Sequence, residues 1–513
     1  MTMQANNDNA ATEANNNHKW LLLLTTCLLT VMLNFDATAV NLAVPVIAHQ
    51  MDAKLATMQW VINAFVLMSA IFQIIGGRSG DLYGHRRIYV IGTIIFVLSS
   101  VFAGFATNDW WLILGRIGQG FALGIAYPMT IVLILNTFPQ NQHGTAIGVL
   151  MGTMGVSLAI GPTLGGVIMH YLSWRWIFLV NLPIGIVTVI CTYLFCKPDP
   201  VKTHSETLDY RGALFLLLGL GGVILALNQS EEWGVGSSAF LSTLIIGLIA
   251  LFILFFVEKN RANRLIDFTL FKIRNYALNS LIRMIAQMVF LPVLFFIPIY
   301  LQNFLGYSPL YTGAIMLACT IVVGVLSPFA GTIVDKLGFK IPNVIAMVAF
   351  SIGCYLLSDL GTQINFPLLF WGLGLIGLGS GISFVSSTSG ALSAVKPEQM
   401  GMATGVFYTI AWGACALGIT IYGMIAAFIS KASLIFHIQQ QNLVETHAQL
   451  NALIRVARGL SPADHLKAYF SSINYPSAVD LSHIAYEHAF HAGFMFLCLI
   501  SIVGILLSCL TKK

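Results

Sequence analysis

The segments GGRSGDLYGHRR (76–87) and AGTIVDKLGFK (330–340) decide the fold of this chain, because they are two copies of one pattern. The matching positions are Gly77, Asp81 and Gly84 in the first segment and Gly331, Asp335 and Gly338 in the second. Glycine lets two helices turn tightly and pack closely, and an aspartate at such a turn can cap the next helix or pair with a neighbouring helix end. One copy would be weak evidence, but two copies at the same spacing predict two homologous halves.

The composition places the chain in a membrane. Of its 513 residues, 57% are hydrophobic and only 9% are charged, and the mean hydropathy is +0.83. Soluble domains average about 25% charged residues. The net charge of +5 is explained by loop placement of Lys and Arg, so we expect no nucleic-acid partner. The eight cysteines fall in apolar segments without metal-ligand spacing, which predicts small buried side chains and no metal site.

A spanning helix needs about 20 mostly apolar residues, and this rule identifies fourteen spans. They are 20–48, 57–78, 88–106, 110–137, 143–170, 174–196, 210–228, 238–257, 275–302, 309–333, 340–359, 366–394, 402–430 and 488–510. Irregular backbone cannot face lipid, so we expect an all-α membrane protein. Residues 1–19 are rich in Asn and Ala and are predicted to be a disordered cytosolic tail.

The loop charges predict the orientation. With the N-terminus in the cytosol, 17 of the 25 Lys and Arg residues fall in inner loops and tails and only 6 in outer loops. This asymmetry follows the positive-inside rule and predicts cytosolic termini. The two loop motifs are eight spans apart rather than six, which predicts a six-helix half (20–196), two extra spans with their linker (197–258) and a second six-helix half (259–513). The second half includes a long outer loop, 431–487.

Asp36, in the stretch LTVMLNFDATAVNLAVPVI (29–47), is the only acid placed deep inside a span. A carboxylate there costs about 2.5–3.5 kcal/mol on insertion scales. It forms either a salt bridge between helices or a site that takes and releases a proton. On a helical wheel Asn34, Thr38 and Asn41 share one face, and Asp36 lies roughly opposite. Transporters are commonly built from two such halves, with the substrate site between the halves near mid-membrane. We therefore expect those three residues to line that cavity and Asp36 to face another helix.

Two arginines also lie within spans. At 1.5 Å per residue, Arg116 is about 9 Å below the outer surface and Asp36 about 15–18 Å, so Arg116 is the candidate partner. Its alternative is a structural bond to backbone carbonyls. Arg283 is expected to extend its side chain to the inner surface, and otherwise to attract anions in the cavity. Gln119 on span four and Gln287 on span nine are further candidates for substrate contact.

Several stretches resemble the 14-span members of the major facilitator superfamily, the EmrB/QacA-type drug:proton antiporters. The matching motif residues are Gly77, Asp81, Gly84, Arg86 and Arg87 in the loop, Arg116, Gln119 and Gly120 in span four, and Gly152, Gly161, Pro162, Gly165 and Gly166 in span five. The first-span stretch LNFDATAVNLAVP (33–45) and the sixth-span stretch WRWIFLVNLPIG (174–185) are similar as well. The resemblance is dense in the first half and sparse after about residue 280.

The resemblance implies a major facilitator fold of two six-helix halves plus two extra central helices. It implies proton-coupled export by alternating access, with Asp36 and Arg116 coupling the proton, and it ties the fifth-span motif to export. The alternative for that motif is close helix packing with a kink. The expected partners are the lipid bilayer, protons and a small-molecule substrate. No cofactor is expected, and the expected location is the bacterial inner membrane.

Other functions remain as alternatives. The exporter could serve multidrug efflux of amphipathic or lipophilic compounds, or a single metabolite such as a siderophore. A proton-coupled importer and a non-transporting membrane sensor fit the motifs less well. No nucleotide-cradling loop or nucleophile–base pair is found, so we expect no enzyme. The long outer loop is a candidate surface for a periplasmic adaptor protein.

Overall fold

The structure is a computed structural model that describes residues 2–51, 55–199, 208–229, 233–234, 236–259, 264–361, 364–441, 446–458, 463–471 and 474–512. Within these ranges the chain is helical and contains no strand. Fourteen of its helices, counting the broken pair α6–α7 as one, are long and apolar enough to cross a membrane. The predicted all-α class and the number of spans are therefore confirmed.

The spans fall into two halves and an extra pair. The first half contains α1 (Thr2–Gln50), α2 (Leu55–Tyr83), α3 (His85–Gly104), α4 (Asp109–Thr137), α5 (His143–Tyr171), α6 (Arg175–Leu179) and α7 (Asn181–Phe195). The extra pair is α8 (Tyr210–Asn228) and α10 (Ser238–Lys259). The second half contains α11 (Arg274–Ile299), α12 (Pro309–Leu337), α13 (Lys340–Ser358), α14 (Phe366–Leu392), α15 (Met400–Gln441) and α17 (Tyr475–Leu510). The short elements are η1 (Gln140–Gln142), η2 (Phe268–Lys272), η3 (Tyr300–Phe304), η4 (Pro397–Gln399), α16 (His447–Ala457) and η5 (Ala463–Ala468).

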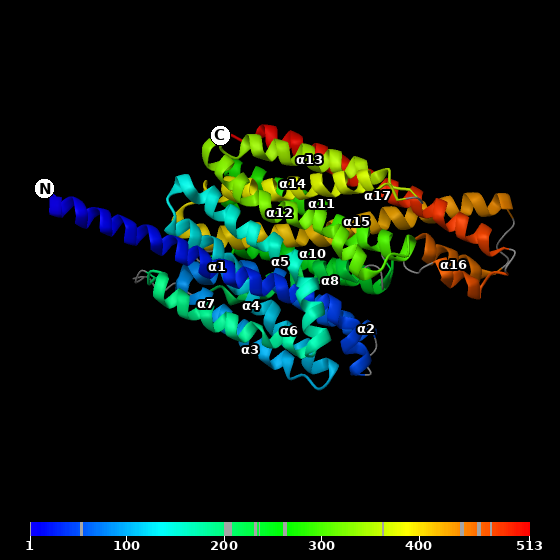
Figure 1. The fold of residues 1–513 in the computed structure, drawn as a ribbon, viewed down its shortest axis with the longest axis horizontal. Coiled ribbons are helices and arrows are strands. Elements are labelled where there is room, and N and C mark those ends of the chain that lie inside the picture. The colour runs from blue at the N-terminus through cyan, green and yellow to red at the C-terminus, as the bar shows by residue number, and fades with distance from the viewer. Residues whose placement is uncertain are drawn as a thin grey trace.

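The two halves lie side by side along the long axis of the bundle (Figure 1). Both chain termini lie at one end, which we call the terminal face, and the opposite end is the far face. The halves contact each other mainly through two helix pairs, α5 with α12 and α2 with α15. The extra helix α8 packs on both α2 and α15, with α10 behind it, so the extra pair covers one of these two seams.

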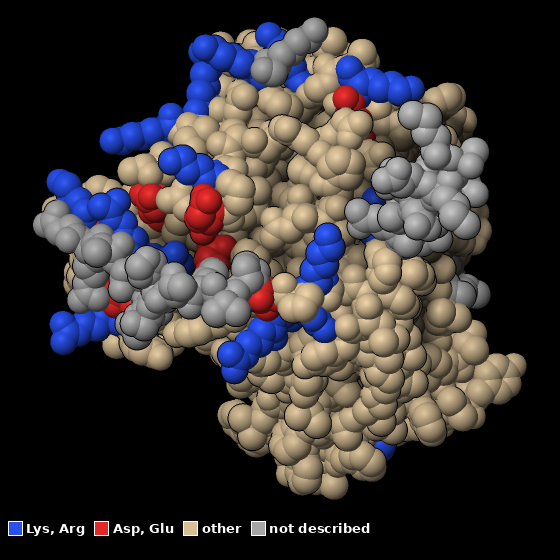
Figure 2. Space-filling view, turned by 90° about the vertical axis from the view of Figure 1, so that its left-hand side faces the viewer, with Lys and Arg blue, Asp and Glu red and all other residues tan. Residues whose placement is uncertain are grey.

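The terminal face carries many basic side chains (Figure 2). Exposed Lys and Arg residues lie where helices begin or end at this face: Arg87, Lys197, Arg211, Lys259, Lys272, Arg274, Lys336 and Lys396. The asymmetry that the loop charges predicted is thus present on one end of the folded bundle.

Two segments differ from the sequence-based expectation. Helix α1 already begins at Thr2, where composition predicted disorder, so the helix of the first span continues on its N-terminal side beyond the apolar residues. Most of the described part of the predicted outer loop 431–487 is also helical, because α15 continues to Gln441, α17 begins at Tyr475 and α16 lies between them. A rule that counts about 20 apolar residues marks only the membrane-embedded part of such a helix.

The far ends of α15 and α17, together with α16 and η5, form a small domain that we call the far-face cap. It has an apolar core of its own, separate from the core of the bundle. The largest buried members are Leu434, Leu453, Leu466, Phe470 and Leu481. The cap is therefore a packed extension of two membrane helices.

Candidate functional site

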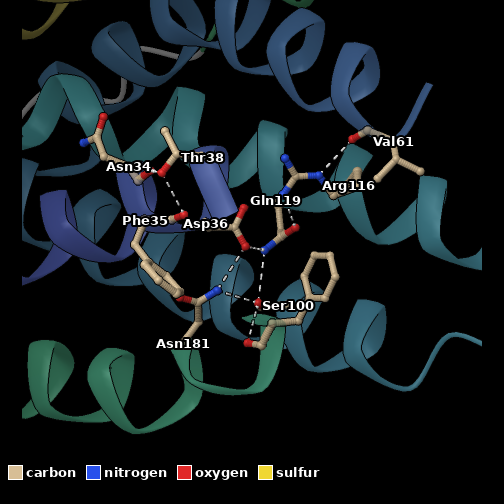
Figure 3. A network of polar contacts seen from close by, with 10 residues as sticks. Asn34, Phe35, Asp36, Thr38, Val61, Ser100, Arg116, Gln119 and Asn181 are labelled. Atoms are coloured by element: carbon tan, nitrogen blue, oxygen red, sulfur yellow. Dashed lines mark hydrogen bonds and ion pairs between the residues drawn. The ribbon is translucent and has the colours of Figure 1, made fainter. Parts of the chain in front are cut away.

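Asp36 lies at the centre of a buried polar network inside the first half (Figure 3). Its side chain is fully inaccessible to solvent. The carboxylate forms an ion pair with the guanidinium of Arg116 on α4. It also accepts hydrogen bonds from Gln119 Nε2 (3.0 Å) and Asn181 Nδ2 (3.1 Å). The expectation that Asp36 faces a partner helix and contacts Arg116 is confirmed.

Arg116 is held in place by three further contacts. Its Nε donates to the backbone carbonyl of Val61 at 2.9 Å, and its Nη1 donates to Gln119 Oε1 at 2.9 Å. The guanidinium lies 4.1 Å from the centre of the Phe65 ring. Arg116 thus makes both of the contacts weighed as alternatives, a carboxylate pair and a backbone carbonyl. The Val61 and Phe65 contacts on α2 would hold the guanidinium even if Asp36 lost its charge.

Ser100 on α3 completes the network. Its hydroxyl donates to the carbonyl of Phe178 (2.8 Å) and accepts from Gln119 Nε2 (3.0 Å) and Asn181 Nδ2 (2.9 Å). It therefore orients both amides that face Asp36. Neither Ser100 nor Asn181 was predicted from the sequence as a site residue. Asn181 lies within the sixth-span stretch that carried the family resemblance, and this match was the signal available for it.

The network suits an ionised carboxylate, since only N–H donors face its two oxygens. A proton on Asp36 would remove the negative charge and put an O–H where donors now point. The ion pair with Arg116 is almost dry, so this change has a large electrostatic effect. A change in the charge of Asp36 would therefore change the contact between α1 and α4.

The predicted substrate stripe lies away from this network. Asn34 Nδ2 donates to Thr30 O (2.8 Å) and Thr38 Oγ1 donates to Asn34 O (2.9 Å), both within α1. Figure 3 shows both side chains pointing away from the Asp36 carboxylate. Thr38 packs on α5, and the side chain of Asn41 lies outside the described residues. Substrate contact by this stripe stays a prediction.

Gln119 and Gln287 were predicted to contact substrate. The amide of Gln119 is committed to Arg116, Asp36 and Ser100, so the structure places it in the Asp36 network. Gln287 lies on α11, one turn after Arg283, and is buried. Its Oε1 has no hydrogen-bond partner within the described residues.

Arg283 does not extend to the inner surface, and that expectation is wrong. Its side chain is buried and packs between α11, α14 and α15, with the guanidinium 3.9 Å from the centre of the Phe384 ring and 5.7 Å from that of Tyr408. It belongs to a face of α11 that also carries Asn279 and Gln287 and points into the bundle. A side chain on this face meets other helices before it can reach water.

The two loop motifs form reciprocal contacts between the halves, which we call the terminal-face locks. Asp81 on α2 accepts from the backbone N–H groups of Gly401 (2.8 Å) and Met402 (2.7 Å), in the first turn of α15. Of the two roles expected for this aspartate, the structure shows pairing with a neighbouring helix end. A carboxylate is stabilised there by the free N–H groups and by the helix dipole.

Asp335 on α12 makes the same contact in the opposite direction. It accepts from the N–H groups of Gly144 and Thr145 (both 2.7 Å) and from the Thr145 hydroxyl (2.6 Å), in the first turn of α5. The second helix of each half thus binds the fifth helix of the other. The locks hold the halves together at the terminal face.

The motif glycines make these contacts possible. A Cβ on Gly77 would lie 2.2 Å from the Gly401 carbonyl oxygen, and a Cβ on Gly331 would lie 2.2 Å from that of Gly144. The turns that follow contain Gly84 (φ 104°) and Gly338 (φ 75°), in a backbone region that favours glycine.

The basic residues after the first turn bind within their own half. The backbone N–H groups of Arg86 and Arg87 each donate to the Asp199 carboxylate at 3.0 Å. Arg86 Nη2 also donates to Tyr193 O at 2.9 Å. These contacts tie the start of α3 to the end of α7.

The fifth-span glycines line α5 on two sides. A Cβ on Gly161 would lie 1.8 Å from Thr38 Oγ1, and one on Gly165 would lie 2.9 Å from Ala39 Cβ, both on α1. Gly152 faces α12 instead. Close packing is therefore part of the motif's role. The side chain of Pro162 lies outside the described residues, and the bending role of this motif with Gly166 stays a prediction.

Within the described part of the chain, no group of three His, Cys, Asp or Glu side chains is placed to hold a metal ion.

The chain is similar in sequence to known bacterial proteins and in fold to a solved transporter. The chain is 28% identical over 464 residues to the "Multidrug resistance protein Stp" of Mycobacterium tuberculosis, covering 88% of this chain and 86% of that protein. It is 28% identical over 407 residues to the "Riboflavin transporter RibZ" of Clostridioides difficile (79% and 87%). A structure of the proton:xylose symporter XylE shares the fold with a TM-score of 0.58 at 14% identity, covering 92% of this chain and 95% of that chain.

The family-level comparison covers most of the chain. The sequence model of the Major Facilitator Superfamily matches residues 26–419, which include both loop motifs, the Asp36 network and Arg283. The XylE structure shows that the chain shares its overall fold with a solved member of that family. The chain is a membrane transporter and belongs to the Major Facilitator Superfamily.

Proposed function

We propose that the protein is a proton-coupled antiporter that exports amphipathic or lipophilic small molecules by alternating access. The observation that carries the proposal is the buried Asp36–Arg116 pair with its three supporting polar side chains. An acidic side chain inside the membrane costs free energy, and such a residue therefore indicates a functional site. The relatives named for multidrug resistance support an efflux role.

The proton step follows from the network. A proton that arrives from the far face binds a carboxylate oxygen of Asp36 and neutralises it, which breaks the ion pair. Arg116 keeps its charge and stays bound to Val61 and Phe65. When the halves exchange their open face, the proton leaves toward the terminal face and the ion pair forms again. One proton is moved inward each time the carboxylate completes this cycle.

The direction of transport is proposed from the locks and the surface charge. The basic terminal face favours a cytosolic location in an inner membrane, with both termini inside. The locks close that face in the structure, so substrate would enter from the cytosol only when Asp81 and Asp335 release their helix ends. An outward-exporting cycle needs this closed state after loading.

Asp36→Asn tests the proposal directly. Asparagine resembles the protonated acid in shape but cannot release a proton. In inverted membrane vesicles with an imposed pH gradient, we expect the variant to lose substrate accumulation while still exchanging substrate down its own gradient. Asp359→Asn, on an exposed carboxylate after α13, is the matched control and should accumulate substrate normally. Wild-type accumulation by Asp36→Asn would contradict the coupling role.

A second candidate function is transport of one dedicated metabolite. The relative named as a riboflavin transporter has the same identity and similar coverage as the multidrug relative, so neither comparison decides between the two. A survey of toxic compounds and secreted metabolites in cells with no transporter, wild type and Asp36→Asn would separate them. Broad protection supports multidrug efflux, and loss of one secreted compound supports a dedicated exporter. The far-face cap is the surface that a periplasmic adaptor would meet.

A further inference from the structure

Arg283 carries a buried positive charge that has no counter-charge among the described residues. The side chain is 2% exposed, and its Nε and Nη1 have no hydrogen-bond partner among the described residues. No carboxylate within those residues forms an ion pair with it. The guanidinium stays charged, because an arginine side chain does not lose its proton in proteins. In contrast, Arg116 meets both a carboxylate and a carbonyl.

The rings around Arg283 stabilise the cation only in part. The guanidinium lies over Phe384, and Tyr408 is within 5.7 Å. Tyr408 packs edge-on against Tyr127 of the other half, with ring centres 5.1 Å apart. Phe290 packs edge-on against Phe384 at 5.3 Å. Aromatic faces attract cations, but they provide no acceptor for the N–H groups.

Three other buried side chains have polar atoms without a hydrogen-bond partner among the described residues. Gln287 Oε1 is one turn along α11, and Ser383 Oγ is next to Phe384. From the other half, Gln73 has neither amide atom bonded, and its backbone contacts Gly405, one turn before Tyr408. Buried polar groups are normally satisfied, so a group of unsatisfied ones calls for an explanation.

The aromatic group also lies at one depth. Arg283 is nine residues into α11, Tyr408 eight into α15, Phe384 eight before the end of α14, and Tyr127 ten before the end of α4. These offsets place all four side chains about 12–15 Å from the terminal face. Arg116 is 21 residues from that end of α4, about 30 Å deep on the same scale. The two buried arginines therefore occupy separate levels of the bundle.

We propose that Arg283, with Tyr127, Phe384 and Tyr408, is a binding subsite for an organic anion that carries an aromatic or other apolar body. The acidic group, such as a carboxylate, supplies the missing acceptor to the guanidinium, and the rings hold the body. This deepens the proposed export function and rests on it, because it names the chemical class of one substrate group. The Asp36–Arg116 ion pair has no net charge, so we assign the Asp36 network to proton binding rather than to the substrate.

The position of the subsite explains how it is loaded. The Tyr127–Tyr408 contact joins the halves, and the terminal-face locks lie between it and the surface. In the described state the subsite is closed to water. It becomes accessible from the terminal face when the locks open and the two tyrosines separate, which is the side from which an exporter collects its substrate.

The test measures equilibrium binding of two matched probes to the purified full-length protein. The probes are 1-naphthoate, an aromatic anion, and 1-naphthylmethylammonium, a cation with the same ring, each followed by equilibrium dialysis. Hydrogen bonds to a charged group are strong, so Arg283→Gln should weaken naphthoate binding by about tenfold to a hundredfold. Binding of the cation should be unchanged or tighter. Arg283→Lys keeps the charge without the planar fork and should fall between.

The control is Arg274→Gln, which removes the same charge from the exposed start of the same helix, where Arg274 bonds Leu510 O. It should leave naphthoate binding unchanged. Because Arg283 is an uncompensated charge, Arg283→Gln should not lower the melting temperature of the ligand-free protein. A lowered melting temperature with equal loss of both probes would mean that Arg283 is structural, and would overturn the proposal. Naphthoate binding that is absent in wild type, or equal in wild type and Arg283→Gln, would overturn it too.

The binding assay can reject the anion subsite without rejecting the proposed antiport. Equilibrium binding needs no proton gradient, so Asp36→Asn should still bind naphthoate. If Asp36→Asn pumps normally while Arg283→Gln loses naphthoate, the coupling proposal is wrong and the anion subsite stands. The reverse result rejects the subsite and leaves antiport in place.

Discussion

The terminal-face locks make a quantitative prediction about the balance between closed and open states. Asp335→Asn keeps one acceptor oxygen, but it loses the negative charge and one of the two bonds to the N–H groups of Gly144 and Thr145. A hydrogen bond to a charged group contributes about 1.5–3 kcal/mol, and a carboxylate at a helix N-terminus about 0.3–1 kcal/mol more. We therefore expect about 2–3 kcal/mol less stabilisation of the closed terminal face. This corresponds to about 30–150-fold in the ratio of closed to open protein.

Asp81→Asn should have a similar effect, because it removes the equivalent contact with Gly401 and Met402. The two locks join different helix pairs, so their effects should add in the double variant. Both locks must break in the same opening motion. The double variant should therefore favour the open state by about 4–6 kcal/mol relative to wild type.

The measurement is the distance between spin labels on the two halves. Leu194 on α7 and Ile341 on α13 are exposed, lie near the terminal face and belong to opposite halves. In a background without native cysteines, labels at these positions should show one main distance in the wild type. A longer distance should appear in each single variant and predominate in the double variant.

Asp199→Asn is the matched control for this experiment. Asp199 also accepts two backbone N–H groups at a helix start, from Arg86 and Arg87, but both partners belong to its own half. The change should lower thermal stability without adding the longer distance. The explanation of the locks is refuted if the double variant keeps the wild-type distance, or if Asp199→Asn opens the protein equally.

Two further predictions concern packing and pH. Gly161→Ala places a Cβ against Thr38 and should destabilise the protein by about 1–3 kcal/mol. A double-mutant cycle of thermal melts should show partial rescue by Thr38→Ala. Gly413→Ala is the control: a Cβ there would meet no atom within 4 Å, so the change should be nearly neutral. Partial burial raises the pKa of Asp267, but hydrogen bonds from Thr269 and Gln399 and the charge of Arg264 outweigh it and hold the pKa below its ordinary value of 3.8. Because the folded-state pKa is lowered, this stabilisation is present above the unfolded pKa and is lost as the pH falls through the folded one. The wild-type melting temperature should therefore fall more steeply below pH 4 than that of Asp267→Asn, and equal slopes would exclude the effect.

The sequence predicts the parts of the site that depend on composition and on position within one helix. Asp36 stands out because an acid is rare in a span, and its depth and helix face together point to Arg116. The duplicated loop motif predicts two halves, because the spacing of its glycines and aspartate can be recognised within one short segment. The partners of Asp81 and Asp335 could not be predicted in this way, since Gly401 and Gly144 lie 320 and 191 residues away and offer only backbone N–H groups.

Arg283 shows where the sequence reasoning was incomplete. Depth alone allowed its side chain to reach the surface, and only the direction of its helix face decides against this. Asn279, Arg283 and Gln287 recur every four residues, which places three polar side chains on one stripe of α11. A polar stripe in a membrane helix faces the bundle rather than lipid, so the signal was present. The rings that surround Arg283 come from three other helices and could not be inferred.

Helix α15 connects the terminal face of the bundle to the far-face cap. It begins at the Asp81 lock and runs without interruption through Tyr408 to the far-face cap, 42 residues or about 63 Å. If α15 rocks as one rod about its middle, a tilt of about 10° moves each end by about 5 Å in opposite directions. The far-face cap would then move whenever the other end of α15 moves at the terminal face, and in the opposite direction. A binder that recognises the cap in one position would then report whether the terminal-face locks are closed or broken.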